Sequence, residues 1–163
     1  MGGDSVLPFF ITIEYFNRKG FDLLIKYFVL ALFVQACFVP FSVFLMFIRR
    51  LRAVNTGEVP ATYFKTYQGL EKSAPRGMVL AERHYANLFQ MPMLFLICGS
   101  IYLSTDMVDK MAVALAWTYV LIRLIHSIIH LGTNKIMHRL CFFAVSSVVL
   151  LVMWIYLIGK FFL

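Results

Sequence analysis

The sequence predicts an all-α integral membrane protein that folds as a bundle of four membrane-spanning helices. First, 61% of its 163 residues are hydrophobic and its mean hydropathy is +0.82, whereas a soluble domain contains about 45–50% apolar residues. Second, the apolar residues form four stretches, each near the length of about 20 residues that a membrane helix needs. Third, two of these stretches contain an arginine followed by polar residues at helical spacing, a pattern typical of a polar site inside a bundle.

The expected spans cover residues 23–48, 77–103, 108–131 and 135–162, within a single domain of residues 1–163. None of them shows the two-residue alternation of a β-barrel strand. The long connection, residues 49–76, contains Gly57, Pro60, Gly69 and Pro75, so we expect turns and short helical pieces there. Residues 8–16 are apolar and aromatic, and we expect them to form a short helix along the membrane interface.

The distribution of charge predicts the orientation of the chain. Residues 49–83 hold seven Lys or Arg against three Glu, and the turn between the third and fourth spans adds Lys135 and Arg139. The loop of residues 104–110 contains Asp106 and Asp109 against one Lys. The positive-inside rule therefore predicts that the basic loops are cytoplasmic and that both termini lie on the opposite side.

The net charge of +7 does not indicate a nucleic-acid partner, because the basic residues flank the spans and no nucleic-acid-binding motif is present. An anionic ligand or anionic lipid fits better. The three cysteines lie in separate apolar stretches without CxxC or metal-ligand spacing. We therefore expect them to be small buried hydrophobic residues. His126 and His130 are four residues apart but lack a third ligand, so the sequence predicts no metal site.

Polar residues at helical spacing form three rows in the last three spans: Arg83, Asn87 and Gln90; Arg123, His126, Ser127 and His130; Lys135 and Arg139. Each row shares one helix face. Hydrogen bonding between helices is one explanation, and snorkelling of cations to the interface is another. A ligand site is favoured for Arg83, because a guanidinium needs an acceptor and the apolar spans offer no carboxylate at its depth.

Cationic and polar groups from all four spans are expected near the cytoplasmic side. Arg49, Arg50 and Arg52 end the first span, either as anchors at lipid headgroups or as a clamp for an anion. The complete set holds many donors and few acceptors: Arg49 or Arg52, Arg83, Asn87, Arg123, His130 and Arg139. A polyanionic or peptide-like ligand would satisfy such a set.

These rows resemble the signature of the MAPEG family, the membrane-associated proteins in eicosanoid and glutathione metabolism. The resemblance covers about residues 25–160 and rests on Arg83-x3-Asn87 with Pro92 and Phe95, on Arg123-Leu-Ile-His126-Ser127, and on His130-Leu-Gly132 with Arg139. It implies a four-span homotrimer that binds glutathione as co-substrate at the cytoplasmic side. It also implies a lipophilic substrate that arrives through the membrane lipid.

The resemblance assigns roles to individual residues. Arg139 would stabilise the glutathione thiolate as the catalytic residue. The remaining residues would bind glutathione: Arg49 or Arg52 a carboxylate, Arg83 and Asn87 its peptide and carboxylate groups, with Gln90, Arg123 and His130 completing or supporting the site. The expected activity is that of a microsomal-type glutathione transferase or peroxidase acting on lipophilic electrophiles.

Three residues depart from the family pattern. Gln90 stands where the signature has glutamate, His130 where many members have tyrosine, and Phe143 where some members carry a hydroxyl. Two interpretations therefore remain open: the glutathione-dependent enzyme, or a non-catalytic accessory or lipid-binding subunit with the same fold. A transporter is disfavoured, because the four spans contain no internal repeat.

Overall fold

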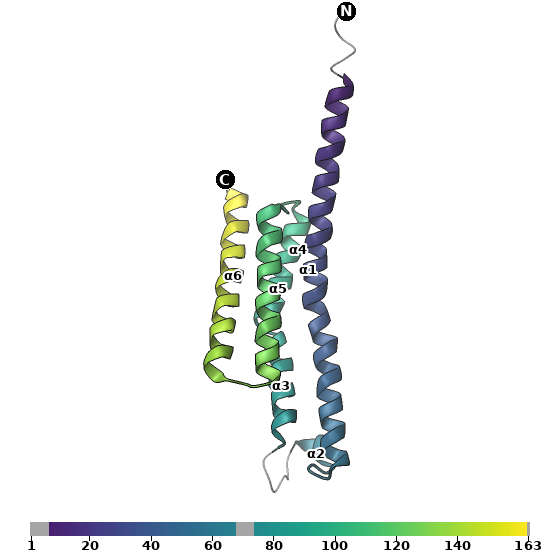
Figure 1. The fold of residues 1–163 in the computed structure, drawn as a ribbon, viewed down its shortest axis with the longest axis vertical. Coiled ribbons are helices and arrows are strands. Elements are labelled where there is room, and N and C mark those ends of the chain that lie inside the picture. Colours follow the sequence, from purple (N-terminus) through teal and green to yellow (C-terminus); the bar gives the residue numbers. More distant parts are fainter. Residues whose placement is uncertain (1–6, 68–73, 163) are drawn as a thin grey trace, which may run out of the picture.

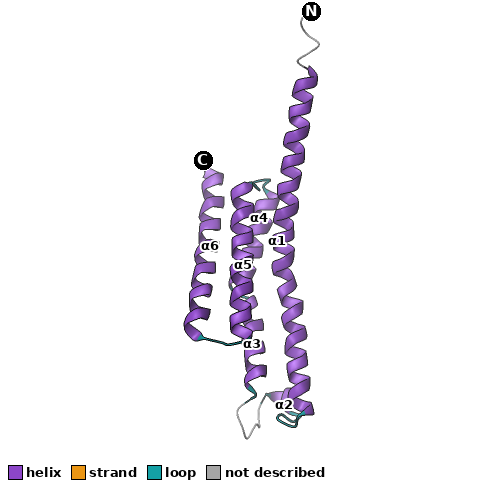
Figure 2. Cartoon of the chain, viewed as in Figure 1, coloured by secondary structure: helices purple, strands orange, loops and turns teal. Residues whose placement is uncertain are grey.

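The protein is all-helical, as predicted. A computed structural model describes residues 7–67 and 74–162, with side chains described from residue 20 onward. The helices are α1 (Leu7–Asn55), α2 (Tyr63–Thr66), α3 (Arg76–Leu88), α4 (Met91–Ser104), α5 (Lys110–Leu131) and α6 (Ile136–Phe162). In Figure 1 the long helices run side by side, and Figure 2 shows only helices and loops in the described ranges.

Within the described residues, four segments are long and apolar enough to cross a membrane: Gly20–Asn55, Arg76–Ser104, Lys110–Leu131 and Ile136–Phe162. The prediction of four spans is therefore confirmed. α1 extends beyond the predicted first span, residues 23–48, at both ends. At the beginning, the short helix expected over residues 8–16 is continuous with it (Figure 1). Its other end reaches Asn55, so the beginning of the loop predicted at residue 49 is helical. No glycine or proline interrupts the chain between Pro40 and Gly57, whose φ of 73° lies outside the helical region.

The second predicted span, residues 77–103, consists of two helices rather than one. α3 ends at Leu88, and α4 begins at Met91 after Gln90, whose backbone has φ −101° and ψ −110°. Pro92 occupies the first turn of α4, where its missing N–H and fixed φ are tolerated. A break in a membrane helix is tolerated where it faces protein or a polar cavity, and Gln90 lines such a cavity, described below.

α5 is the central helix of the bundle. It packs against α1, α3 and α6, while α4 packs against α1, α3 and α6. Ala112 and Ala116 on α5 are fully buried and allow neighbouring helices to approach closely. The rings of Phe95 and Tyr119 stack with their centroids 4.4 Å apart. The core therefore relies on small and aromatic residues, and large apolar side chains of α1 and α6 face outward, where lipid or another copy would cover them.

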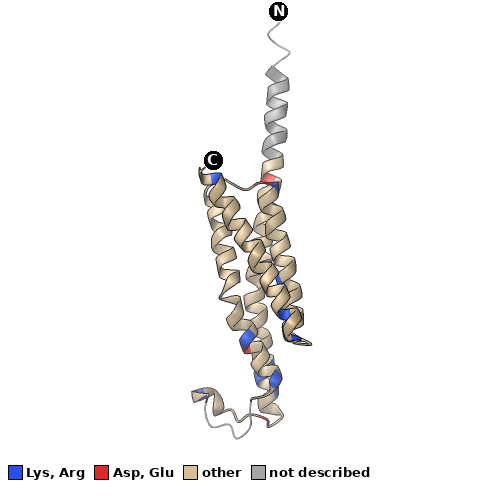
Figure 3. Cartoon of the chain, turned by 90° about the vertical axis from the view of Figure 1, so that its left-hand side faces the viewer, with Lys and Arg blue, Asp and Glu red and all other residues tan. Residues whose placement is uncertain are grey.

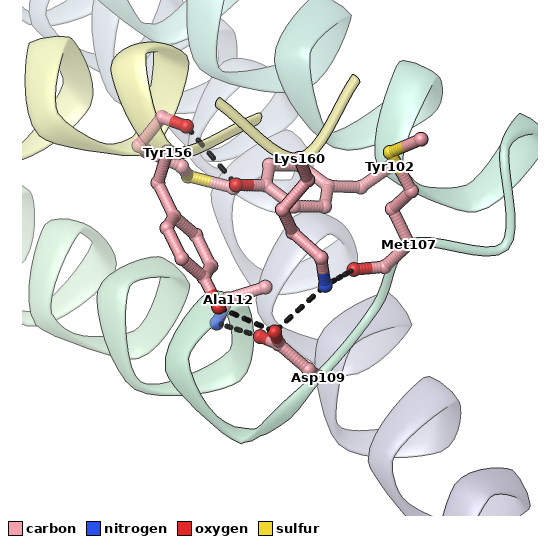
Figure 4. A network of polar contacts seen from close by, with 7 residues as sticks. Tyr102, Met107, Asp109, Ala112, Tyr156 and Lys160 are labelled. Atoms are coloured by element: carbon pink, nitrogen blue, oxygen red, sulfur yellow. Dashed lines mark hydrogen bonds and ion pairs between the residues drawn. The ribbon is translucent and has the colours of Figure 1, made fainter. Parts of the chain in front are cut away.

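A polar network closes the end of the bundle at the α4–α5 loop (Figure 4). The Asp109 carboxylate accepts hydrogen bonds from the Ala112 amide at 2.8 Å, the Tyr156 hydroxyl at 2.6 Å and the Lys160 ammonium at 2.7 Å. Partial burial of Asp109 opposes its ionisation, but these three donors outweigh burial and lower the pKa of the carboxyl below its ordinary value. Asp109 thus caps α5 and fastens it to α6.

Candidate functional site

The basic residues concentrate in the half of the bundle nearer α2, as Figure 3 shows. The interior of the bundle also contains buried polar side chains, which are costly in a membrane unless they serve a structural or binding role. They come from α1, α3, α5 and α6: Gln35, Ser42, His84, Arg123, His126, Ser127, His130 and Ser146. Of the three polar rows recognised in the sequence, only the row on α5 is buried in the bundle. Arg83 and Gln90 are exposed, and Asn87 and Arg139 are half-buried.

A pocket of about 350 Å³ lies between α3, α5 and α6 and reaches the α3–α4 break. This pocket, which we call the cationic pocket, is lined by Arg83, Asn87, Gln90, His126, His130, Ile136, Arg139, Leu140 and Phe143. Arg83 and Asn87 lie on one face of α3 because they are four residues apart. Gln90 joins them because the chain turns out of the helix there. Two guanidinium groups, two amides and two imidazoles thus meet beside an apolar wall.

His126 fixes the polar side of the cationic pocket. Its Nδ1 lies 3.1 Å from the backbone carbonyl oxygen of Arg139, and its Nε2 lies 3.1 Å from the side-chain amide nitrogen of Asn87. A carbonyl can only accept, so in the neutral ring Nδ1 carries the hydrogen and Nε2 accepts from Asn87. The amide oxygen of Asn87 is buried and has no partner among the described residues, so this polar atom is left unsatisfied within the described chain.

Arg139 is half-buried at the start of α6 and lines the same pocket. Its Nη1 donates to the side-chain oxygen of Asn134 at 3.0 Å. Asn134 adopts a left-handed conformation with φ 50° in the α5–α6 turn, a conformation that asparagine tolerates. The turn therefore holds the guanidinium by a neutral acceptor, which leaves its positive charge available to an anion in the pocket.

Arg49 and Arg52 do not line the cationic pocket. They line a separate pocket of about 350 Å³ with Glu58, Gly77 and other residues at the ends of α1 and α3. Arg49 donates from Nη1 to the carbonyl of Gly77 at 2.8 Å and from Nη2 to that of Leu131 at 3.3 Å. Within one chain, Arg49 therefore ties the ends of α1, α3 and α5 together.

Arg123 lies in the core behind the cationic pocket rather than in its wall. Only 1% of its surface is exposed, and its guanidinium carbon lies 5.8 Å from the ring centre of Phe143, which does line the pocket. His130 reaches both places, because it lines the pocket while its ring lies 5.6 Å from that of His84, edge to face. A supporting position for Arg123 agrees better with this geometry than direct ligand binding.

Comparison with known proteins decides the family. The family model described as "MAPEG family" matches residues 28–159. The chain belongs to the MAPEG family. Neither the search of curated proteins nor the search of solved structures returned a match. As a MAPEG protein it is an integral, multi-pass membrane protein with a four-helix bundle, from a family linked to glutathione and eicosanoid metabolism.

The MAPEG bundle brings five of the eight predicted site residues into one pocket: Arg83, Asn87, Gln90, His130 and Arg139. It places Arg123 behind the pocket and Arg49 and Arg52 in another. The predicted set of site residues did not include four residues that line the cationic pocket: His126, Ile136, Leu140 and Phe143. In the sequence, His126 stands out only as a member of a polar row and Phe143 only as a departure from the family pattern. The spacing of Arg123 and His126 placed His126 on the right helix face, but only the packing of α5 against α3 and α6 shows that it reaches Asn87.

Proposed function

We propose that this MAPEG protein is a glutathione-dependent membrane transferase or peroxidase that acts on lipophilic electrophiles. One observation carries the proposal: Arg83 and Arg139 face the same pocket, between two amides and two imidazoles. Arg83 can bind a carboxylate of glutathione, as guanidinium groups do well, and Arg139 can then face its thiol. The pocket volume of about 350 Å³ also lies within the range of about 300–1,000 Å³ usual for small-molecule sites.

In the proposed mechanism Arg139 stabilises the thiolate of glutathione. A free thiol has a pKa of about 8.5 and is mostly protonated at neutral pH, whereas the thiolate is the nucleophile. A guanidinium in a poorly hydrated pocket favours the anion by direct charge attraction. The thiolate sulfur then forms a bond to the electrophilic carbon, and the thiol proton leaves with the displaced group or passes to solvent.

The apolar wall of the cationic pocket supports a lipophilic second substrate. Ile136 is 68% exposed and Leu140 is 58% exposed on the outer face of α6, and both line the pocket. A substrate dissolved in the membrane could therefore approach the thiolate sideways, between helices, without crossing the charged end of the bundle. This arrangement suits a hydrophobic electrophile better than a water-soluble one.

The proposal includes a homotrimer, as the resemblance implies, with the basic loops in the cytoplasm and both termini on the opposite side. In such an assembly, Arg49 or Arg52 of a neighbouring copy would be positioned to add a cation to the cationic pocket. The arrangement of the basic residues at one end of the bundle (Figure 3) supports this orientation under the positive-inside rule.

A non-catalytic accessory or lipid-binding subunit is the second candidate. Two observations favour it: Gln90 contributes an uncharged amide, and Arg139 already donates to Asn134. Such a subunit would bind an anionic lipid or peptide in the cationic pocket without activating a thiol.

Substitution of Arg139 separates the two candidates. We expect Arg139→Ala to lower conjugation turnover about a hundredfold, the effect typical of losing one stabiliser of a developing or resting anion. Glutathione affinity should change less than about threefold, because the thiolate is a small part of the ligand. The measurements are steady-state turnover with a lipophilic electrophile and calorimetric glutathione binding on detergent-purified protein.

Lys135→Ala is the matched control, because Lys135 is an exposed cation just before α6 and does not line the pocket. It should leave turnover and affinity near the wild-type values. Equal losses of turnover and affinity in Arg139→Ala would contradict thiolate stabilisation. Glutathione binding without turnover in the wild type would favour the accessory subunit.

A further inference from the structure

The turn between α5 and α6 holds the guanidinium of Arg139 by a neutral side chain. Nη1 of Arg139 donates to the amide oxygen of Asn134 at 3.0 Å, and both residues are half-buried. Neither of the salt bridges found among the described residues includes Arg139. Asn134 therefore directs this guanidinium without neutralising its charge.

The backbone of the turn restricts which residue can stand at position 134. Asn134 has a φ of 50°, in the left-handed region that glycine, asparagine and aspartate adopt more readily than other residues. Its backbone N–H donates to the carbonyl oxygen of Ile129 at 2.7 Å and so closes the end of α5. Glycine would close the turn equally well, but it would leave Arg139 without this acceptor. The side chain of Asn134 therefore does more than the turn alone requires.

Two arginines from other helices hold the same turn. Nη2 of Arg49, on α1, donates to the carbonyl oxygen of Leu131 at 3.3 Å. Nη2 of Arg76, on α3, donates to the carbonyl oxygen of Thr133, also at 3.3 Å. Each of these contacts is long for a hydrogen bond, but together they link the turn to two further helices. The turn that contains Asn134 is therefore placed by α1 and α3 as well as by α5 and α6.

The electrostatic surroundings of Arg139 make the neutrality of Asn134 important. The charged and titratable groups that share the pocket lining with Arg139, or neighbour it in sequence, come from α3, α5 and the start of α6: Arg83, His126, His130, Lys135 and His138. The described pocket lining includes no carboxylate. A neutral acceptor at position 134 keeps the charge of Arg139 for an anion, whereas a carboxylate there would pair with the guanidinium and compete with that anion.

We propose that Asn134 is a positioning residue for the reaction, whose neutral amide oxygen holds the guanidinium of Arg139 at the pocket and leaves its charge to the thiolate. This inference rests on the proposed function, because Arg139 acts on the thiolate there. Asn134 does not line the cationic pocket, so it acts through Arg139. The contact between the two side chains then belongs to the catalytic arrangement and does not compete with it.

Asn134→Asp tests the importance of the neutral acceptor, because aspartate has nearly the same shape and tolerates the same backbone conformation. We expect the pH of half-maximal turnover to rise by about one unit, since a carboxylate paired with Arg139 weakens stabilisation of the thiolate. Turnover on the acidic side of the profile should fall about tenfold. At alkaline pH, where the thiol ionises in both proteins, turnover should approach that of the wild type. Steady-state turnover of the full chain in detergent, with glutathione and a lipophilic electrophile, gives the profile, and the ultraviolet absorbance of the thiolate checks its midpoint.

Asn134→Gly tests the positioning separately from the charge. Glycine keeps the left-handed backbone but removes the acceptor, so Arg139 keeps its charge and loses its fixed direction. We expect an unchanged midpoint and a maximal turnover lowered about three- to tenfold. Thr133→Asp is the matched control, because Thr133 is exposed in the same turn and the change adds the same charge at a side chain that does not bond Arg139. It should leave the midpoint and the maximal turnover near the wild-type values.

The outcomes separate this inference from the proposed function. Equal midpoints in the wild type and Asn134→Asp would overturn the inference, as would an equal upward shift in Thr133→Asp. Undiminished maximal turnover in Asn134→Gly would show that Asn134 does not position Arg139. In each of these cases, wild-type turnover and its loss in Arg139→Ala would leave the proposed function standing. Absence of wild-type turnover at every pH would contradict the proposed function and this inference with it.

Discussion

His126 is the residue on which the geometry of the cationic pocket depends most. Its ring joins the backbone of α6 at Arg139 to the side chain of Asn87 on α3, with both distances at 3.1 Å. It thereby fixes the orientation of the Asn87 amide, whose buried oxygen has no partner among the described residues. We regard His126 as a positioning residue that acts through Asn87.

A double-mutant cycle tests this role. His126→Phe keeps an aromatic ring but removes both hydrogen bonds, so we expect glutathione affinity to fall about tenfold, or roughly 1.4 kcal/mol. In the background of Asn87→Ala the same substitution should change affinity less than about twofold, because the residue through which it acts is gone. Calorimetric titration of the four proteins gives the coupling, and additive losses would contradict it.

For α5, the helical spacing predicted which residues face inward but not what each one touches; on α3, Arg83 and Gln90 are exposed. Arg123 and His126 share a helix face, yet Arg123 is enclosed in the core and His126 lines the pocket. Helical spacing tells which residues share a face of α5. Whether a residue on that face lines the pocket or lies in the core depends on which neighbouring helix packs against it. Arg49 illustrates the same limit, since its backbone partners at Gly77 and Leu131 are distant in sequence.

Among the structural elements, α5 and α6 are fastened at one end by the Asp109 network (Figure 4). The folded state lowers the pKa of Asp109, so it binds the proton of this carboxyl less readily than the unfolded chain does. The stabilisation is therefore fully present above the ordinary pKa of about 3.9 and is lost as the pH falls through the lower folded value.

We expect Asp109→Asn to lower stability by about 1 kcal/mol at neutral pH, because asparagine still caps α5 but no longer pairs with Lys160. Below about pH 4 the difference between wild type and variant should shrink, since the wild-type carboxyl becomes protonated as well. Thermal unfolding in detergent at several pH values measures this convergence.

Asp106→Asn is the control for the same loop. Asp106 is exposed and has φ 53°, a conformation that asparagine adopts readily, so this change should leave stability nearly unaltered. A difference between wild type and Asp109→Asn that stays constant down to acidic pH would show that charge on Asp109 does not stabilise the bundle.

The elements themselves were largely predictable. Apolar length alone located four spans, because a membrane requires it, and the predicted third and fourth spans correspond closely to α5 and α6. The α3–α4 break was not predicted, although Pro92 lay within the expected span. A proline in the first turn of a new helix and a proline within a continuous helix look alike in sequence; the conformation of Gln90 distinguishes them.

On the scale of the whole molecule, the two ends of the bundle differ in chemistry. The end at the α4–α5 loop balances its charges within the Asp109–Lys160 pair. The half nearer α2 carries an excess of cations and the cationic pocket (Figure 3). The MAPEG match over residues 28–159 spans both halves. The difference in charge between the two ends is therefore a feature of the complete four-helix unit and not of a separate binding domain.

Calorimetric titration of the purified protein with glutathione shows whether the cationic pocket binds an anionic peptide thiol. We predict saturable binding with a dissociation constant of about 1 mM or tighter, equivalent to roughly −4 kcal/mol, and a loss of about tenfold in Arg83→Met, which removes one of the two guanidinium groups from the pocket. No saturable heat at millimolar glutathione, or full wild-type affinity in Arg83→Met, would mean that the cationic pocket is not a glutathione site.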